Sequence, residues 1–193
     1  MLRNNQSNAV TKSIKNNFSS GIHCHATGTG KSWIALEIII AFNKIFSNKN
    51  ILWLCEHKSI LIEQFNYDNL KSRGYEKVYD IFNIINFSEN KKKEWINDIN
   101  NYNNSKPILL IINRSFLVSK KKYELINKNI SLIIHDECHS ISNKTTQEFY
   151  KFILNKNCNI SCLGFSATPN FDIKPFDNVI SNYSIYDAYC DNV

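Results

Sequence analysis

The sequence predicts an α/β fold with an open, mostly parallel β-sheet that is covered by helices on both faces. Short apolar runs rich in β-branched residues recur along the chain, and helical or polar segments separate them. The runs are apolar throughout rather than alternating with polar residues, as strands of a parallel sheet covered on both faces must be. Strands that alternate with helices in this way are typical of an α/β open sheet.

The order of these segments gives an expected element map. Strands are expected at residues 22–25, 51–55, 78–82, 108–112, 132–135 and 159–165. Helices are expected at residues 31–46, 59–72, 90–102 and 145–154. No internal repeat interrupts this alternation, so one domain accounts for the pattern.

Composition indicates a globular protein without a membrane segment. The chain has 193 residues, of which 43% are hydrophobic and 12% aromatic, enough for one sizeable core. The net charge of +6 permits a polyanionic partner without requiring one. None of the six cysteines forms a C-x-x-C pair and no signal peptide is recognisable. We therefore expect reduced thiols in an intracellular, cytoplasmic protein.

The stretch HATGTGKS, residues 25–32, predicts a phosphate-binding loop. Gly28 and Gly30 let the backbone turn so that successive N–H groups point at phosphate oxygens. A helix that begins at Lys31 adds positive partial charge at the same place. Lys31 can reach the β- and γ-phosphates, and Ser32 can place its hydroxyl on Mg²⁺.

The alternative is a glycine turn followed by a chance Lys-Ser pair. The expected strand before the loop and the expected helix after it disfavour that interpretation. One position departs from the general G-x-x-x-x-G-K-[ST] pattern, which has glycine where this chain has His25.

The stretch SLIIHDECHS predicts an apolar strand that ends in two adjacent acids, Asp136 and Glu137. Triphosphate hydrolysis needs a carboxylate near Mg²⁺ and a second group that orients and polarises the attacking water. Ligands of open α/β sheets bind at the carboxyl ends of the strands, so this pair is expected beside the phosphate loop. A zinc site at His135, Cys138 and His139 is disfavoured, because no partner pair stands at zinc spacing.

Three motifs in order resemble a known family. HATGTGKS, DECH and GFSATP (residues 164–169) resemble motifs I, II and III of superfamily 2 helicases, the DEAD/DEAH-like motor proteins. LRNNQ (residues 2–6) resembles the family's amino-terminal glutamine motif. EHKSILIEQ (residues 56–64) resembles motif Ia of the branch with type I and type III restriction-enzyme translocating subunits and XPB-like helicases.

The resemblance implies the amino-terminal RecA-like P-loop NTPase domain of a helicase or translocase, with ATP and Mg²⁺ as cofactors. It implies that the catalytic residues are Lys31, Asp136 and Glu137, the last as catalytic base. The implied ATP-binding residues are Gln6, at the adenine, and Thr27, Gly28, Thr29, Gly30, Lys31 and Ser32, at the phosphates. Ser32 and Asp136 are implied to hold Mg²⁺, Asp136 through water.

The resemblance also implies residues that connect ATP to a nucleic-acid partner, with DNA favoured over RNA. Coupling residues are implied at His139, Ser166 and Thr168, and nucleic-acid contacts at His57, Lys58 and Ser115. Ser115 fits the Thr-x-Gln-Ser strand end that is usual in this branch, but Ile112 stands in the threonine place. Two interpretations without a functional role stay open: Gln6 as a polar residue at a frayed terminus, and Ser-Ala-Thr-Pro as a turn that ends a strand.

Helicases of this kind use two RecA-like domains, and only the first is expected here. It covers residues 1–182, and residues 183–193 are expected to begin a linker into a second domain. The three arginines, Arg3, Arg73 and Arg114, lie in no context typical of an arginine finger. Hydrolysis is therefore expected only with a second RecA-like domain, in cis or from a partner chain. The alternative is a stand-alone ATP-binding module with little turnover that acts through a partner protein; a phosphotransferase kinase is disfavoured by the order of the motifs.

The nucleic-acid assignment makes a prediction for Lys58. Lys58→Glu should weaken binding to every sequence, because a lysine that neutralises a phosphate releases counterions whatever the bases are. Charge reversal at residues 91–93, which we assign to a solvated helix face, should matter less. Binding of a fluorescent single strand and duplex at several salt concentrations measures both. A salt-independent affinity, or one lost with residues 91–93 but not with Lys58, would contradict the assignment.

Overall fold

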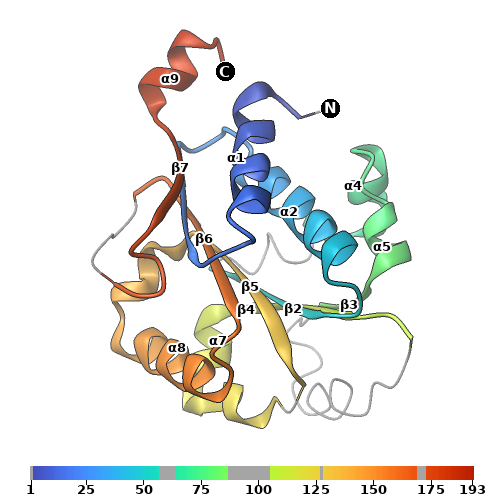
Figure 1. Cartoon of the computed structure of the whole chain (residues 1–193), viewed down its shortest axis with the longest axis vertical. Coiled ribbons are helices and arrows are strands. Elements are labelled where there is room, and N and C mark those ends of the chain that lie inside the picture. The colour runs from blue at the N-terminus through green and yellow to red at the C-terminus, as the bar shows by residue number, and fades with distance from the viewer. Residues whose placement is uncertain (1, 57–63, 87–104, 127, 169–172) are drawn as a thin grey trace.

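A parallel β-sheet forms the centre of the computed structural model, which describes residues 2–56, 64–86, 105–126, 128–168 and 173–193 (Figure 1). Within those residues the sheet has seven strands, and every neighbouring pair is parallel. In their order across the sheet the strands are β3 (Asn83–Asn86), β4 (Ile108–Asn113), β2 (Asn50–Cys55), β5 (Ile130–Asp136), β6 (Ser161–Ser166), β1 (Gly21–His25) and β7 (Val179–Tyr183). The expected α/β fold is confirmed.

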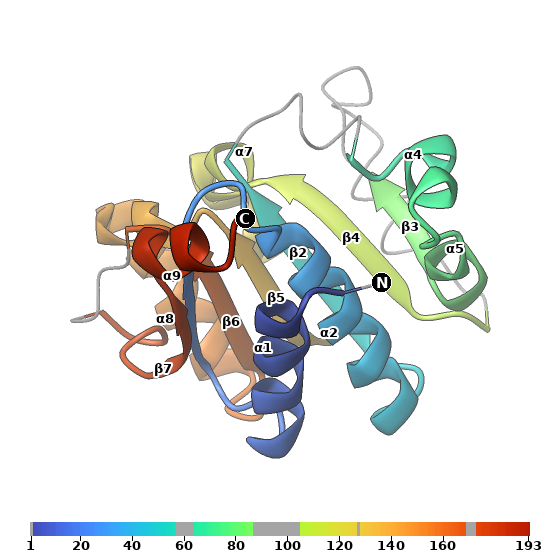
Figure 2. The same cartoon turned by 90° about the horizontal axis from the view of Figure 1, so that it is seen from above.

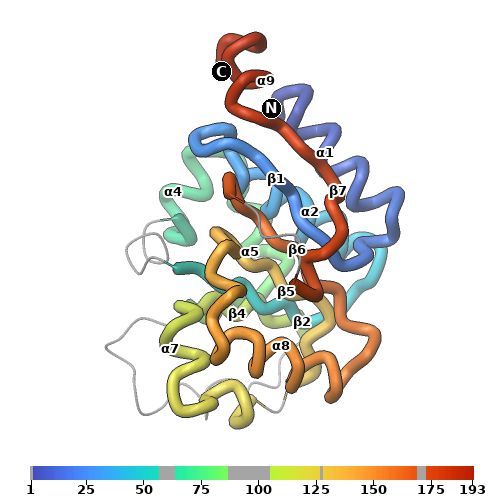
Figure 3. The backbone as a smooth tube through the Cα atoms, turned by 90° about the vertical axis from the view of Figure 1, so that its left-hand side faces the viewer, coloured from blue at the N-terminus to red at the C-terminus, as the bar shows by residue number. Residues whose placement is uncertain are grey.

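Helices cover both faces of the sheet (Figure 2). One face carries α1 (Asn4–Lys15), α2 (Lys31–Ile45), α4 (Tyr67–Ser72) and α5 (Lys77–Ile81). The other face carries α7 (Arg114–Val118), the 3₁₀ segments η2 (Ser119–Leu125) and η3 (Cys138–Ser142), and α8 (Lys144–Lys156). The last helix, α9 (Ile185–Cys190), projects beyond the sheet where β7 stops, and both chain ends lie on that side (Figures 1 and 3).

The two faces bury separate cores, because successive side chains of a strand point to opposite sides. In β2, Ile51 and Trp53 pack into the core beneath α2, whereas Leu52 and Leu54 pack into the core beneath α8. All four side chains are almost completely inaccessible to solvent. Burial on both faces explains why the strands read as continuous apolar runs.

Five of the six expected strands are confirmed, but the strand expected at residues 78–82 is wrong. Residues 78–81 belong to α5 instead, Phe82 caps that helix, and the strand β3 begins at the next residue. Val78 and Phe82 are buried in the same core while Asp80 between them is exposed, and the Phe82 N–H donates to the Val78 carbonyl over 2.9 Å. A spacing of four residues between buried positions suits a helix, which outweighs the β-branched content of the segment.

Several other elements could not be read from sequence. The unexpected strands β3 and β7 lie at the two edges of the sheet and have four and five residues, too short for a periodic signal. The helix α1 is largely polar, and only its contacts with α2 and β7 show what it covers (Figure 3). The helices expected at residues 31–46 and 145–154 are confirmed as α2 and α8.

One helix expectation falls partly, and another entirely, outside the described residues. Of the helix expected at residues 59–72, the final part is α4 and residues 59–63 lie outside the described ranges. The whole of 90–102, with the lysines at 91–93, also lies outside them.

The cysteines and the helix lengths complete the description of the fold. Four of the six cysteines are buried, and Cys158 and Cys190 are exposed. All six are free thiols. Within the residues described above, no helix is long and apolar enough to cross a membrane.

A buried polar chain ties α1 and the edge strand β7 to β1. The Ser13 hydroxyl of α1 lies 2.9 Å from Nε2 of His23, and Nδ1 of His23 lies 2.6 Å from the Ser181 hydroxyl of β7. The same hydroxyl lies 2.7 Å from Nε2 of His25. Hydrogen bonds of this kind compensate part of the cost of burying polar groups between the sheet and α1.

Burial keeps both of these imidazole rings neutral. Burial, together with the nearby His25 and Lys12, lowers the pKa of His23 to about 3. Burial, together with Lys31 and Lys12, lowers the pKa of His25 to about 4. The ordinary value is 6.5, so neither ring carries a charge in the folded protein near neutral pH.

The free energy of unfolding should therefore fall as the pH is lowered from 7 to 5. The unfolded chain protonates His23 and His25 below pH 6.5, while the folded chain resists until pH 4 or lower. Each histidine then removes about 2 kcal/mol of stability over that interval. Burial of His135 acts in the same direction. Asp136 acts in the opposite direction. Burial raises its pKa to about 6, so the folded chain binds this proton at a higher pH than the unfolded chain does.

Urea unfolding at several pH values measures this dependence. His23→Gln should flatten the slope, because it removes one of the groups that resist protonation. Asn182→Gln, at an exposed residue of β7 that carries no titratable group, is the control and should leave the slope unchanged. An unaltered slope in His23→Gln would show that this ring is not a source of the acid sensitivity.

Candidate nucleotide-binding site

The predicted phosphate loop connects the end of β1 at His25 to the start of α2 at Lys31. Gly28 and Gly30 both have left-handed backbone, with φ of 82° and 87°, which glycine adopts without steric cost. A Cβ atom at Gly30 would also collide with the amide of Gln6, whereas a Cβ at Gly28 would meet open space. The Thr29 hydroxyl donates to the Ala26 carbonyl over 2.6 Å and closes the turn.

The position of His25 explains why the loop lacks the first glycine of the general pattern. It is the last residue of β1, paired in register with Tyr183 of β7, and its backbone is not left-handed. Its side chain is buried and bonds to Ser181 through Nε2. The position is therefore part of the sheet rather than of the turn, and the backbone does not require glycine there.

Gln6 is buried against the phosphate loop from α1. Its Nε2 donates to the Thr29 carbonyl over 2.9 Å, and its Oε1 accepts from the Arg3 backbone N–H over 2.9 Å. Only 5% of the residue is exposed. Each amide atom keeps one further bonding position, a second hydrogen on Nε2 and a second lone pair on Oε1. The predicted contact with adenine stays a prediction, and these positions are the ones available for it.

The acid pair lies beside the loop. Asp136 ends β5, and Nζ of Lys31 lies 3.2 Å from Oε1 of Glu137 and 3.4 Å from the His25 carbonyl. Lys31 is only 7% exposed, so this ammonium group is held between the loop and the acid pair. The edge of the sheet thus brings together the two motifs that stand about a hundred residues apart in sequence.

The electrostatics of Asp136 fit a cation. Burial first, and then the adjacent carboxylate of Glu137, raise the pKa of Asp136 to about 6, against the effects of Lys31 and a hydrogen bond from Ser32. A hydroxyl and a carboxylate are hard oxygen ligands of the kind that Mg²⁺ prefers. Among the described residues, no group of three or more His, Cys, Asp and Glu side chains could hold a metal. Ser32 and Asp136 could therefore hold Mg²⁺ only together with phosphate and water oxygens, which is its usual mode in nucleotide sites.

The backbone of Glu137 is unusual. With φ of 54° and ψ of 50°, this residue occupies the left-handed region that side-chain-bearing residues seldom adopt. The turn aims Glu137 back at Lys31. Such backbone persists where the surroundings over-determine it, and it clusters at functional sites.

The three predicted coupling residues lie on two neighbouring strand ends. His139 in η3 is half exposed, and its Nδ1 lies 3.5 Å from Oε2 of Glu137. Ser166 ends β6, the strand next to β5, and its hydroxyl accepts from the Thr168 backbone N–H over 3.1 Å. Their proximity to the acid pair supports the assignment, and coupling itself stays a prediction.

Of the predicted nucleic-acid contacts, only Ser115 lies within the described residues. It is exposed in the first turn of α7, and its hydroxyl accepts from Nη2 of Arg114 over 3.1 Å. His57 and Lys58 lie outside the described ranges. Ile112 is completely buried in β4, so the residue in the threonine place offers no surface for a ligand.

Sequence reasoning missed a polar network centred on Glu56 and Arg114. The Arg114 guanidinium donates through Nη2 to Oε2 of Glu56 over 2.9 Å, and Nε also donates to the same carboxylate. The register of β2 and β4 pairs Cys55 with Asn113, so the next residue of each strand lies at the same edge. An acid and an arginine that directly follow two predicted strands were the available signal. Their pairing required the strand order.

The same carboxylate also contacts the residues around the acid pair. Its Oε1 accepts from the Ser140 hydroxyl over 2.7 Å and lies 3.4 Å from Nε2 of His135. Burial alone would raise the pKa of Glu56, but the hydrogen bonds from its partners outweigh it and lower the pKa to about 2. Burial lowers the pKa of His135, so this ring is neutral. The ionised Glu56 carboxylate can only accept, so the proton of the neutral ring is assigned to Nε2, and the Tyr150 hydroxyl, 2.8 Å from Nδ1, donates to that nitrogen.

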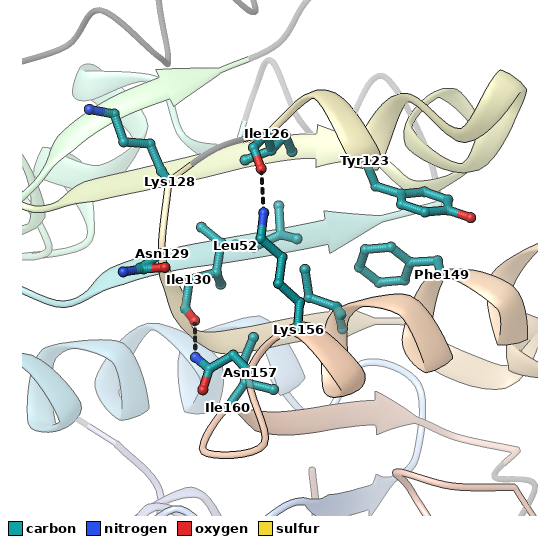
Figure 4. Close-up of a pocket in the computed structure, with 11 residues that line it drawn as sticks. Leu52, Tyr123, Ile126, Lys128, Asn129, Ile130, Phe149, Lys156, Asn157 and Ile160 are labelled. Atoms are coloured by element: carbon teal, nitrogen blue, oxygen red, sulfur yellow. Dashed lines mark hydrogen bonds between the residues drawn. The ribbon is translucent and has the colours of Figure 1, made fainter.

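Two hollows lie at the opposite, amino-terminal edge of the sheet and do not compete for a nucleotide. One is a cavity of about 20 Å³ between η2, α8 and the start of β5 (Figure 4), which is room for about one water molecule. The other is an open groove of about 650 Å³ beyond the ends of α2 and α8. Carbonyl groups at the carboxyl ends of helices carry negative partial charge, which disfavours phosphate there.

The sheet, the phosphate loop after β1 and the acid pair after β5 define the class of the protein: an amino-terminal RecA-like domain of superfamily 2 helicases. The family model described as Type III restriction enzyme, res subunit, matches residues 1–171. The chain belongs to this family, and it is a helicase-type motor domain of the restriction-enzyme type.

Two solved structures are similar to the whole chain. One is a nuclease-deletion mutant of the Type ISP restriction-modification enzyme LlaGI in complex with a DNA substrate mimic. Its TM-score is 0.68 and its sequence identity 16%, and the match covers 100% of this chain and 20% of the LlaGI chain. The other is the ATP-dependent Type ISP restriction-modification enzyme LlaBIII bound to DNA. Its TM-score is 0.69 and its sequence identity 16%, and the match covers 100% of this chain and 16% of the LlaBIII chain. The chain thus spans a fifth or less of these enzymes, and the likeness shows the fold. No curated protein matches the chain.

The geometry of the loop predicts the effect of removing Lys31. Lys31→Ala should abolish ATP·Mg²⁺ binding and leave the protein folded, because it deletes the ammonium group placed to pair with the β- and γ-phosphates. Lys44→Ala, at an exposed lysine in the last turn of the same helix, is the matched control and should bind normally. Calorimetric titration measures both affinities. Equal affinity for Lys31→Ala and the unchanged protein would place the nucleotide elsewhere.

Proposed function

We propose that the chain is the ATP-binding motor domain of a nucleic-acid-dependent ATPase, a helicase or translocase that acts on DNA. The observation that carries the proposal is the ion pair of Lys31 with Glu137, which joins the phosphate loop to the acid pair at one edge of the sheet. Membership of a restriction-enzyme subunit family supports it. So do the DNA-bound state of both similar enzymes and the ATP dependence of one of them.

In this proposal the loop and the acid pair divide the chemistry of hydrolysis. The backbone N–H groups of residues 27–32 and the Lys31 ammonium group bind the phosphates, and Gln6 contacts the adenine. Mg²⁺ held by Ser32 and Asp136 would neutralise charge that develops on the phosphoryl oxygens. Lys31 exchanges Glu137 for the phosphates, and the freed Glu137 carboxylate orients the attacking water and accepts its proton.

The proposal requires a second RecA-like domain, because two of the three arginines of this domain are engaged elsewhere and the third, Arg3, is an exposed residue at the start of α1. The guanidinium of Arg114 is buried against Glu56, and that of Arg73 lies over the Trp33 ring, 4.5 Å from its centroid. Neither is free to reach a phosphate. We propose that residues 1–182 form the first domain and that residues 183–193, which include α9, lead toward the second.

The purified chain should be nearly inert as an ATPase, with or without nucleic acid. An arginine supplied by a second domain or a partner is worth ~10³–10⁵ in rate in related triphosphatases, and none of the three arginines of this chain lies in a context typical of an arginine finger. Phosphate release is measured with the protein alone and with single-stranded DNA, duplex DNA and RNA. Substantial stimulated turnover by residues 1–193 would show that the chain needs no second domain.

The alternative of a stand-alone ATP-binding module is tested by linkage. In a motor domain, DNA and ATP·Mg²⁺ should each change the affinity for the other by the same factor. Titrations of a fluorescent DNA with and without a non-hydrolysable ATP analogue measure that factor. A factor of one would favour the stand-alone module over the motor domain.

A further inference from the structure

Glu56 connects three neighbouring strand ends of the sheet. It directly follows β2, and its carboxylate contacts Arg114, which directly follows β4, and His135 and Ser140, which flank the end of β5. The side chain of Glu56 is 13% exposed and that of His135 is fully buried. In this partly desolvated position each of these hydrogen bonds is worth more than at an open surface.

Arg114 holds the Glu56 carboxylate in place. Its Nη1 donates to the Thr146 hydroxyl of α8 over 2.8 Å, and its Nη2 donates both to Glu56 and to the Ser115 hydroxyl. The guanidinium plane is therefore fixed by groups from β2, α7 and α8. A planar, bidentate pair of this kind orients a carboxylate more strictly than a lysine would.

The contacts of Glu56 lie on both sides of the strained turn. His135 directly precedes Asp136, and Ser140 follows Glu137 by three residues. The left-handed backbone of Glu137 lies between them. Since a non-glycine residue keeps such a backbone only where the surroundings over-determine it, the two bonds to Glu56 are a physical reason for its persistence.

We propose that Glu56 is a positioning residue that holds the Asp136–Glu137 turn in place and connects it, through Arg114, to the start of α7 at Ser115. A displacement of α7 moves Arg114, and the shared carboxylate passes that displacement to Ser140 and so to the turn. The inference rests on the proposed function, because it assigns the turn to the metal and the attacking water. It adds a second route of coupling, from the predicted nucleic-acid contact at Ser115 to the acid pair, beside the one predicted through Ser166 and Thr168.

The test compares two serines of the same short segment η3. The Ser140 hydroxyl donates to Glu56, whereas the Ser142 side chain is exposed and forms no hydrogen bond within the described residues. ATP affinity is measured by calorimetry for Ser140→Ala and Ser142→Ala, once with Mg²⁺ and once with a chelator. In Ser140→Ala the gain in affinity that Mg²⁺ provides should fall by about tenfold, as expected for the loss of a hydrogen bond to a charged group. Metal-free affinity should stay unchanged, because it depends on the loop.

Ser142→Ala should match the unchanged protein in both conditions. Glu56→Gln, where thermal melting shows that it folds, should repeat the effect of Ser140→Ala and should also weaken the linkage between DNA and nucleotide. A proportional loss of both affinities together with a lower melting temperature would reduce Glu56 to a purely structural role. Identical behaviour of the two serine variants would overturn the inference while leaving the proposed function intact. Absence of ATP·Mg²⁺ binding in the unchanged protein would overturn both.

Discussion

All strands of the described sheet run in the same direction, and the arrangement of the candidate site depends on this constraint. A parallel strand brings its carboxyl end to the same edge as its neighbours. The ends of β1, β2, β4, β5 and β6 therefore meet there, with the polar residues that follow them. Lys31 reaches Glu137, and Glu56 reaches Arg114, because their strands end together rather than because they are near in sequence.

The charges at this edge stabilise one another only in part. Two carboxylates and one ammonium group share the candidate nucleotide site, and burial raises the pKa of Asp136 to about 6. A neighbouring set, Glu56 with Arg114, is better balanced, and there the hydrogen bonds outweigh burial. The set around Asp136 and Glu137 would be balanced by a bound cation, whereas the Glu56 carboxylate already has its partners.

Two polar networks approach the site from different sides. On the α1 face, Gln6 bonds the phosphate loop directly, and the chain through Ser181 holds the last residue of β1. On the α8 face, Glu56 bonds the segments before and after the acid pair. The loop and the acid pair are thus each anchored by a network of their own, and the ion pair of Lys31 with Glu137 joins them.

The sequence by itself determined the fold class, five strands, the phosphate loop and the acid pair. These features follow from local patterns: continuous apolar runs, glycines before Lys31, and two acids after a strand. Only the tertiary structure decided that residues 78–81 are helical rather than extended, because Val78 and Phe82, four positions apart, are buried in one core. It also decided the pairing of Glu56 with Arg114, which are 58 positions apart. That contact depends on strand order and register, and no local pattern specifies which strand ends become neighbours.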